Sequence, residues 1–158
     1  MATRDKQFHS ACQEEVYRQV KSYLDELVDE HCDFYLKYGS TVLEISIDPY
    51  EEDDAVIEVL AFCVQGVGVS FELMRELLRL NSEVRLGGFS LVGNDIFFSH
   101  AFLGRRLPPE QLIASLEAVA SISDEYDEQL VERYGGETAL ERIRKDVRQP
   151  NARAAESN

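Results

Sequence analysis

The segment from Val56 to Val64 constrains the fold more than any other part of the chain, because it is apolar at nearly every position. Successive side chains of a β-strand point to opposite faces of the sheet, so both faces of this strand are apolar. The segment 96–103 has the same property and follows a polar, glycine-containing turn at 92–95, which is typical of a hairpin. The sequence therefore predicts a sheet whose central strands are covered on both faces.

The length of 158 residues predicts one domain, which we place at 10–147. A chain of this size hides roughly 70% of its unfolded surface, so it needs no disulfide framework to build a core. Residues 148–158 lack large apolar side chains and are expected to form a disordered tail, and residues 1–9 a flexible N-terminus.

Charge limits the classes of partner. Sixteen basic and thirty acidic side chains give a net charge of −14. Such a chain repels phosphate backbones and anionic lipid headgroups, so neither nucleic acid nor a membrane surface is expected as the main partner. The same field favours a partner with basic flanks.

Three cysteines without regular spacing do not form a disulfide framework and favour a reducing compartment. The charged first residues are followed by no apolar run of the kind a signal peptide requires. The longest apolar stretch, Val59 to Val64, has six residues, against the ~20 that span a bilayer. These features predict a cytoplasmic protein.

Hydrophobic periodicity divides the chain into helices and strands in the order α-β-β-β-α-β-β-α-α. The predicted fold class is α+β, with a mainly antiparallel sheet of about five strands packed with three to four helices. The segment 48–54 is predicted to be an acidic loop. The predicted helices are 10–31, 70–81, 109–134 and 137–147, and the predicted strands are 34–38, 43–48, 56–64, 84–91 and 96–103.

The helix at 70–81 carries its polar side chains in one narrow stripe and is apolar around the rest of its circumference. This pattern predicts a largely buried helix that packs on more than one neighbour. On the strand 96–103, the bulkier set Ile96, Phe98 and Phe102 is assigned to the core. Phe97 and Leu103 then point to the opposite face, where the small side chains between them leave a shallow apolar groove. These small side chains are Ser99 and Ala101.

Several features in sequence carry a family resemblance. They are Tyr38-Gly39-Ser40-Thr41 before a strand, an apolar strand ending at Gly66, a helix ending in Leu80-Asn81, Arg85-Leu86-Gly87-Gly88-Phe89-Ser90-Leu91, Ile96-Phe97-Phe98-Ser99-His100-Ala101-Phe102-Leu103-Gly104, and Ala118-Val119-Ala120 before Asp124-Glu125-Tyr126-Asp127. Over about 10–136 the chain resembles the YbjN-like proteins, which are grouped with type III secretion chaperones. The resemblance implies a secretion-chaperone-like α+β fold, usually dimeric, and peptide or protein binding without catalysis. It offers no functional residues to transfer.

No catalytic, metal or cofactor site is predicted. A structural zinc site requires four ligands with tight paired spacing, whereas the pairs His9/Cys12 and His31/Cys32 stand at opposite ends of one predicted helix and no second CxxC or HxxxH motif exists. His100 lies between two phenylalanines and has no nucleophile motif with it. The acidic runs match no EF-hand loop, and Gly66-Val67-Gly68 lacks the rest of a phosphate loop.

The leading hypothesis is a homodimeric, chaperone-like module that holds an apolar or extended segment of a client protein or peptide. The alternatives are a regulatory or assembly-factor domain that docks a folded partner and, third, an enzyme. The far face of the sheet would be covered by a second copy, by the client or by the first helix crossing over. The residues expected at the binding surface or dimer interface are Phe97, Leu103, Met74, Leu77 and Leu78.

Overall fold

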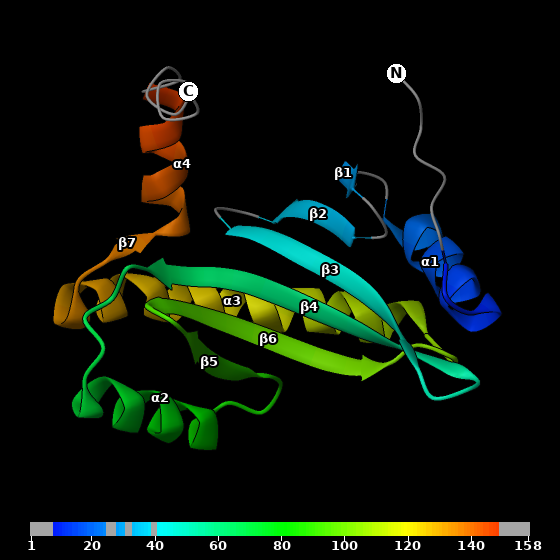
Figure 1. Cartoon of the computed structure of the whole chain (residues 1–158), viewed down its shortest axis with the longest axis horizontal. Coiled ribbons are helices and arrows are strands. Elements are labelled where there is room, and N and C mark those ends of the chain that lie inside the picture. The colour runs from blue at the N-terminus through cyan, green and yellow to red at the C-terminus, as the bar shows by residue number, and fades with distance from the viewer. Residues whose placement is uncertain (1–7, 25–27, 31–32, 39–40, 149–158) are drawn as a thin grey trace.

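The computed structural model describes residues 8–24, 28–30, 33–38 and 41–148, and within them one antiparallel sheet is backed by helices (Figure 1). The strands are β1 (Val28–Glu30), β2 (Asp33–Tyr38), β3 (Thr41–Tyr50), β4 (Asp54–Gln65), β5 (Gly88–Val92), β6 (Asp95–Leu103) and β7 (Glu137–Thr138). The helices are α1 (Ala11–Tyr23), α2 (Phe71–Glu83), α3 (Pro109–Tyr134) and α4 (Ala139–Arg148). The predicted fold class and element order are confirmed, with β1 and β7 as additional short strands.

The sheet has the strand order β1-β2-β3-β4-β6-β5, and β7 pairs with one end of β4. Strand register places Phe34, Ile45 and Val59 side by side on β2, β3 and β4, and all three are fully buried. The long helix α3 runs behind β4 and β6 (Figure 1) and also packs against β3 on this face. The alternation predicted for the central strands is therefore confirmed on the core side.

The first helix packs on the same face as α3. The ring of Tyr17 stacks on that of Phe34 with 4.8 Å between centroids. Gln13 Nε2 donates a hydrogen bond of 2.7 Å to the carbonyl oxygen of Ile47. A Cβ at Gly104 would lie 2.8 Å from Val16 Cγ1, so only glycine allows this approach. The alternative in which the first helix crosses to the far face of the sheet is wrong.

The first helix also ends earlier than predicted. Ser10 caps it as an N-cap residue, since its Oγ accepts a 3.0 Å hydrogen bond from the Gln13 N–H. Leu24, however, has extended backbone (φ −126°, ψ 120°), and Val28 pairs with Tyr35 in the sheet. The predicted end of this helix at residue 31 is wrong. Beyond Leu24 only Leu27 and Val28 continue the helical spacing of apolar residues, and strand pairing with β2 overrides this weak signal.

The acidic loop predicted at 48–54 is a short turn of residues 51–53. β3 continues to Tyr50, which pairs with Asp54 at the start of β4. The carboxylate of Asp54 accepts hydrogen bonds from the N–H groups of Ala55 at 2.8 Å and Arg105 at 2.9 Å. These bonds fix the strand end, so Asp48, Pro49 and Tyr50 lie in a strand and not in the predicted loop.

The strand predicted at 84–91 begins only at Gly88. Gly87 has φ +84°, and a Cβ there would lie 2.5 Å from the Ser99 carbonyl oxygen. The bend predicted at the glycine pair is thus confirmed, and it separates Val84 and Leu86 from the strand.

The long helix has its predicted bounds. Pro109 stands at its first turn, and Gly135, with φ +76°, ends it. The final helix begins two residues later than predicted, because Glu137 and Thr138 pair with β4. Thr138 and Glu141 form a reciprocal capping box with N–H to side-chain distances of 3.2 and 2.9 Å. The predicted tail from 149 onward and residues 1–7 lie outside the described residues.

Candidate functional site

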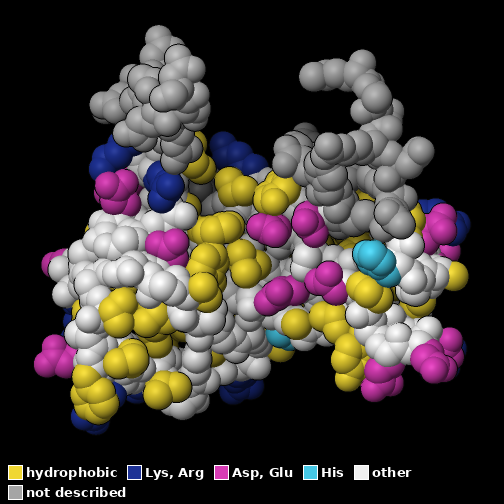
Figure 2. Space-filling model, in the orientation of Figure 1, with side chains coloured by type: hydrophobic (Ala, Val, Ile, Leu, Met, Phe, Trp, Pro, Cys, Tyr) yellow, Lys and Arg dark blue, Asp and Glu magenta, His cyan; other side chains and the backbone are white. Residues whose placement is uncertain are grey.

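The second face of the sheet carries no helix over β4 and β6, and it faces the viewer in Figure 1. We call this surface the open face. Figure 2 shows apolar side chains gathered on it, with acidic side chains among them. The open face consists of side chains that alternate with the core residues of β3, β4 and β6, most of them half-buried: Val42, Glu44, Ser46, Val56, Glu58, Leu60, Phe62, Phe97, Ser99, Ala101 and Leu103.

Strand register brings the apolar members together. Phe62 and Phe97 are paired across β4 and β6, with their rings edge to face at 4.8 Å. Val56 lies opposite Leu103, which is 50% exposed. Phe98 on the other side of β6 is fully buried, so the predicted division of this strand is correct.

Two carboxylates lie within this apolar surface. Glu44 pairs with Leu60, and Glu58 pairs with Ser46, so the two glutamates are diagonal neighbours on β3 and β4. Burial raises the pKa of Glu44 above its usual range, and the negative charges of Asp33 and Glu58 add to this effect. Among the described residues, neither glutamate takes part in a hydrogen bond or an ion pair.

The last helix borders the open face at one end and stands out from the sheet (Figure 1). Ile143 of this helix lines a cavity of 270 Å³ together with Val42 and Phe62 of the open face. Arg142 and Gln65 line the same cavity. The open face and α4 therefore form one continuous concave surface that combines apolar and basic side chains.

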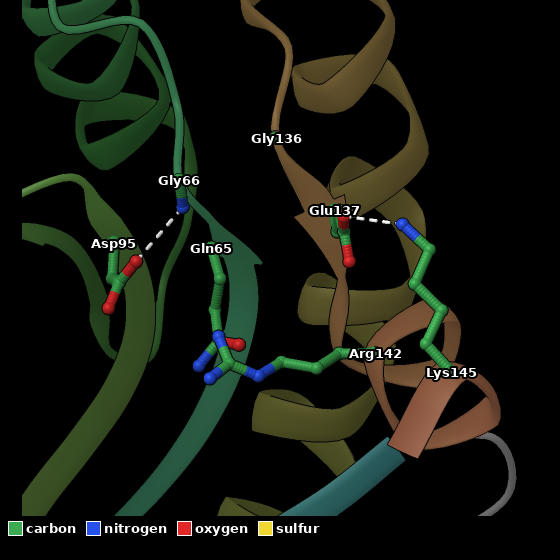
Figure 3. Close-up of a pocket in the computed structure, with 7 residues that line it drawn as sticks. All are labelled: Gln65, Gly66, Asp95, Gly136, Glu137, Arg142 and Lys145. Atoms are coloured by element: carbon green, nitrogen blue, oxygen red, sulfur yellow. Dashed lines mark hydrogen bonds and ion pairs between the residues drawn. The ribbon is translucent and has the colours of Figure 1, made fainter. Parts of the chain in front are cut away.

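A second cavity, of 570 Å³, shares Arg142 and Gln65 with the first in its lining (Figure 3). The carboxylate of Asp95 accepts a 3.0 Å hydrogen bond from the Gly66 N–H, and Glu137 pairs with Lys145. The Arg142 side chain extends toward Gln65, whose buried Oε1 has no hydrogen-bond partner among the described residues. Both acidic side chains of this cavity, Asp95 and Glu137, already have partners among its lining residues, so the cavity presents no free acid–base pair.

The half-buried His100 and the buried Cys63 each contact a buried serine of α3. His100 Nδ1 lies 2.9 Å from Ser115 Oγ under α3, and burial lowers the pKa of the imidazole. Burial raises the pKa of the Cys63 thiol to about 12, although Ser123 Oγ lies 3.4 Å away and lowers it. In the part of the chain that the structure describes, no group of three or more metal-ligating side chains occurs.

The second helix presents another apolar surface. Leu73, Leu77 and Leu80 point into the core, whereas Phe71 and Leu78 are 69% and 70% exposed. We call the outward side chains the α2 surface. They are Val69, Phe71, Met74 and Leu78.

The three α2 residues predicted for the binding surface or dimer interface thus fall into two groups. Met74 and Leu78 belong to the α2 surface, but Leu77 is only 5% exposed and packs in the core. The prediction of a largely buried helix is also wrong for the single chain. A helix that is apolar nearly all round does not reveal which side meets the sheet, and so Phe71 was missed.

None of the helices among the described residues is both long and apolar enough to cross a bilayer.

Two solved structures share the fold. The crystal structure of the ExsC–ExsE complex contains a chain with a TM-score of 0.55 and 14% identity, over 77% of this chain and 96% of that one. The HopA1–SchA chaperone–effector complex contains another, with a TM-score of 0.52 and 11% identity, over 81% and 99%. No curated protein matches the sequence.

A family model supplies the classification, and it confirms the resemblance noted in the sequence. The model is described as "T3SS (YopN, CesT) and YbjN peptide-binding chaperone 1" and matches residues 10–142, which includes every element from α1 to the start of α4. The chain therefore belongs to this family of peptide-binding chaperones.

Proposed function

We propose that this protein is a non-catalytic chaperone that holds an extended segment of a client protein on its open face and works as a homodimer joined through the α2 surface. The observation that carries the proposal is the open face itself. The two central strands show apolar side chains to solvent on the side that neither α1 nor α3 covers. A large apolar area of this kind marks a binding site in most folded proteins.

The fold supports a protein client. The two similar solved structures are both complexes, and one is described as a chaperone–effector complex. An extended segment laid on the open face would bury side chains between Phe97 and Leu103, where Ser99 and Ala101 leave room. The net charge of −14 would steer basic-flanked clients toward the chain.

The α2 surface suits a second copy of the chain. Phe71, Met74 and Leu78 lie on one side of α2 and Val69 directly precedes the helix, so a two-fold axis can bring the same patch of two chains together. The neighbouring carboxylate of Glu76 is already paired with Arg79 at 2.9 Å and Arg133 at 3.2 Å. The carboxylate of Glu76 therefore adds little charge repulsion across such an interface.

Affinity purification with mass spectrometry, followed by reconstitution with the purified client, tests the proposal. Phe97→Asp and Leu103→Asp should each abolish client binding while circular dichroism shows a folded protein. Ile113→Asp is the matched control, because Ile113 is an exposed apolar residue on α3, away from both surfaces. Retention of the client by Phe97→Asp would contradict the proposal.

A folded partner would give a different result. A client held as an extended segment should bind equally well as an isolated peptide. A partner that binds only in its native fold would favour an assembly-factor domain instead.

A further inference from the structure

The open face is an apolar surface with two acidic side chains at its centre. Glu44 and Glu58 are both half-buried, and Leu60 lies between them as the cross-strand partner of Glu44. A half-buried carboxylate without a partner is less stable than one in water, and a second carboxylate beside it adds repulsion. A cation that approaches the pair relieves both effects.

The last helix places basic and apolar side chains beside one end of the open face. Between Ala139 and Arg148 it carries four basic and two acidic side chains. Its Ile143 lines a cavity with Val42 and Phe62 of the open face, and the adjacent Arg142 lines the same cavity. One end of the open face is therefore bordered by an apolar side chain next to a basic one, both from this chain itself.

A second copy of the chain is a poor occupant of the open face. A two-fold axis through the face would place the unpaired glutamates of both copies near each other. Like charges that meet in a poorly solvated interface repel each other, which disfavours this arrangement. The same repulsion disfavours an acidic segment.

We propose that the open face selects an extended client segment in which a lysine or arginine stands between apolar residues. Its cation lies on Glu44 and Glu58, and its aliphatic stem lies on Leu60. Neighbouring apolar side chains of the segment then pack on Phe62 and Phe97. This inference rests on the proposed function and names the chemistry of its client.

Two synthetic peptides test the inference. In both, valine alternates with serine, and the central residue is lysine in one and glutamine in the other. Fluorescence anisotropy of the labelled peptides with the full chain should show the lysine peptide binding about tenfold tighter. The variant Glu44→Gln/Glu58→Gln should lose this preference and still bind the glutamine peptide. The variant Glu72→Gln/Glu117→Gln, which removes two exposed carboxylates elsewhere, should keep it.

Each other outcome overturns the inference in a distinguishable way. Equal binding of both peptides refutes the cation site and leaves peptide binding intact, whereas binding of neither peptide refutes the proposed function as well. A lysine preference that survives in Glu44→Gln/Glu58→Gln also refutes the site. A change of dimerisation in that variant would assign the face to a second copy. A preference for the lysine peptide that appears only after deletion of residues 1–7 would assign the open face to this chain's own Arg4 and Lys6.

Discussion

The open face and the α2 surface are both apolar, yet they differ in shape and in charge. The open face is built from three strands, and it contains two carboxylates that have no hydrogen-bond or ion-pair partner among the described residues. The α2 surface is one side of a helix, its largest side chains are about 70% exposed, and the carboxylate beside it is paired with arginines. Apolar exposure alone does not identify a partner, because the charge within the surface decides between a copy of the chain and a basic client.

The largest expected effect separates the two sides of β6. Phe98→Ala should lower the free energy of unfolding by about 3–5 kcal/mol, because the fully buried ring contacts Phe89 and fills the core. Phe97→Asp should leave the chain folded. Urea denaturation measures both. If Phe97→Asp unfolds the chain and Phe98→Ala does not, the two faces are reversed.

The next effect separates the two sides of α2. Leu77→Ala should destabilise the chain by about 2–5 kcal/mol, since Leu77 is buried. Leu78→Asp should not unfold the chain but should convert the dimer to a monomer of 18.0 kDa. Light scattering coupled to size exclusion at micromolar concentration measures the mass. A wild-type chain that is monomeric at every concentration contradicts the proposed dimer.

A smaller effect is expected where α4 joins the sheet. Burial raises the pKa of Asp127 to about 6, and the charges of Asp124, Glu128 and Glu141 add to this effect. The folded chain then holds this proton more tightly than the unfolded chain, so stability falls as pH rises from about 4 to 6.

Asp127→Asn should remove this loss. The raised pKa of Asp127 corresponds to at most about 3 kcal/mol in the free energy of unfolding. Because the carboxyl group is half-exposed and screened by solvent, we expect the variant to gain on the order of 1 kcal/mol of stability at pH 7. Urea denaturation at pH 4 and pH 7 should show a flatter pH dependence for the variant. A variant less stable than wild type at pH 7 would show that the carboxylate is needed in its ionised form.

The smallest effect concerns neither surface. Deletion of residues 148–158, predicted to be a disordered tail, should shift the melting temperature by less than about 2 °C. A drop of many degrees would show that this segment packs on the domain.

Alternation and chain-breaking residues made much of the fold predictable from the sequence. The buried and half-buried sides of β3, β4 and β6 follow directly from the period of two, and Pro109 and Gly135 mark the ends of α3. The end of α1 could not be predicted, because pairing of Val28 with Tyr35 is a contact between separate segments.

The candidate site was only partly predictable for the same reason. The sequence placed Phe97 and Leu103 opposite the core, since strand alternation fixes their face. It could not place Glu44 and Glu58 beside each other, because strand register is a tertiary property. Nor could it show that Leu77 is buried while Phe71 is exposed, because both lie on a helix that is apolar nearly all round.

Site-specific photocrosslinking tests the division of roles between the two surfaces most directly. A photoreactive residue at Ala101, exposed on the open face, should crosslink to the client, and one at Leu78 should crosslink to a second copy of the chain. Mass spectrometry of the adducts identifies each partner. Self-crosslinks from Ala101 together with client crosslinks from Leu78 would contradict the account.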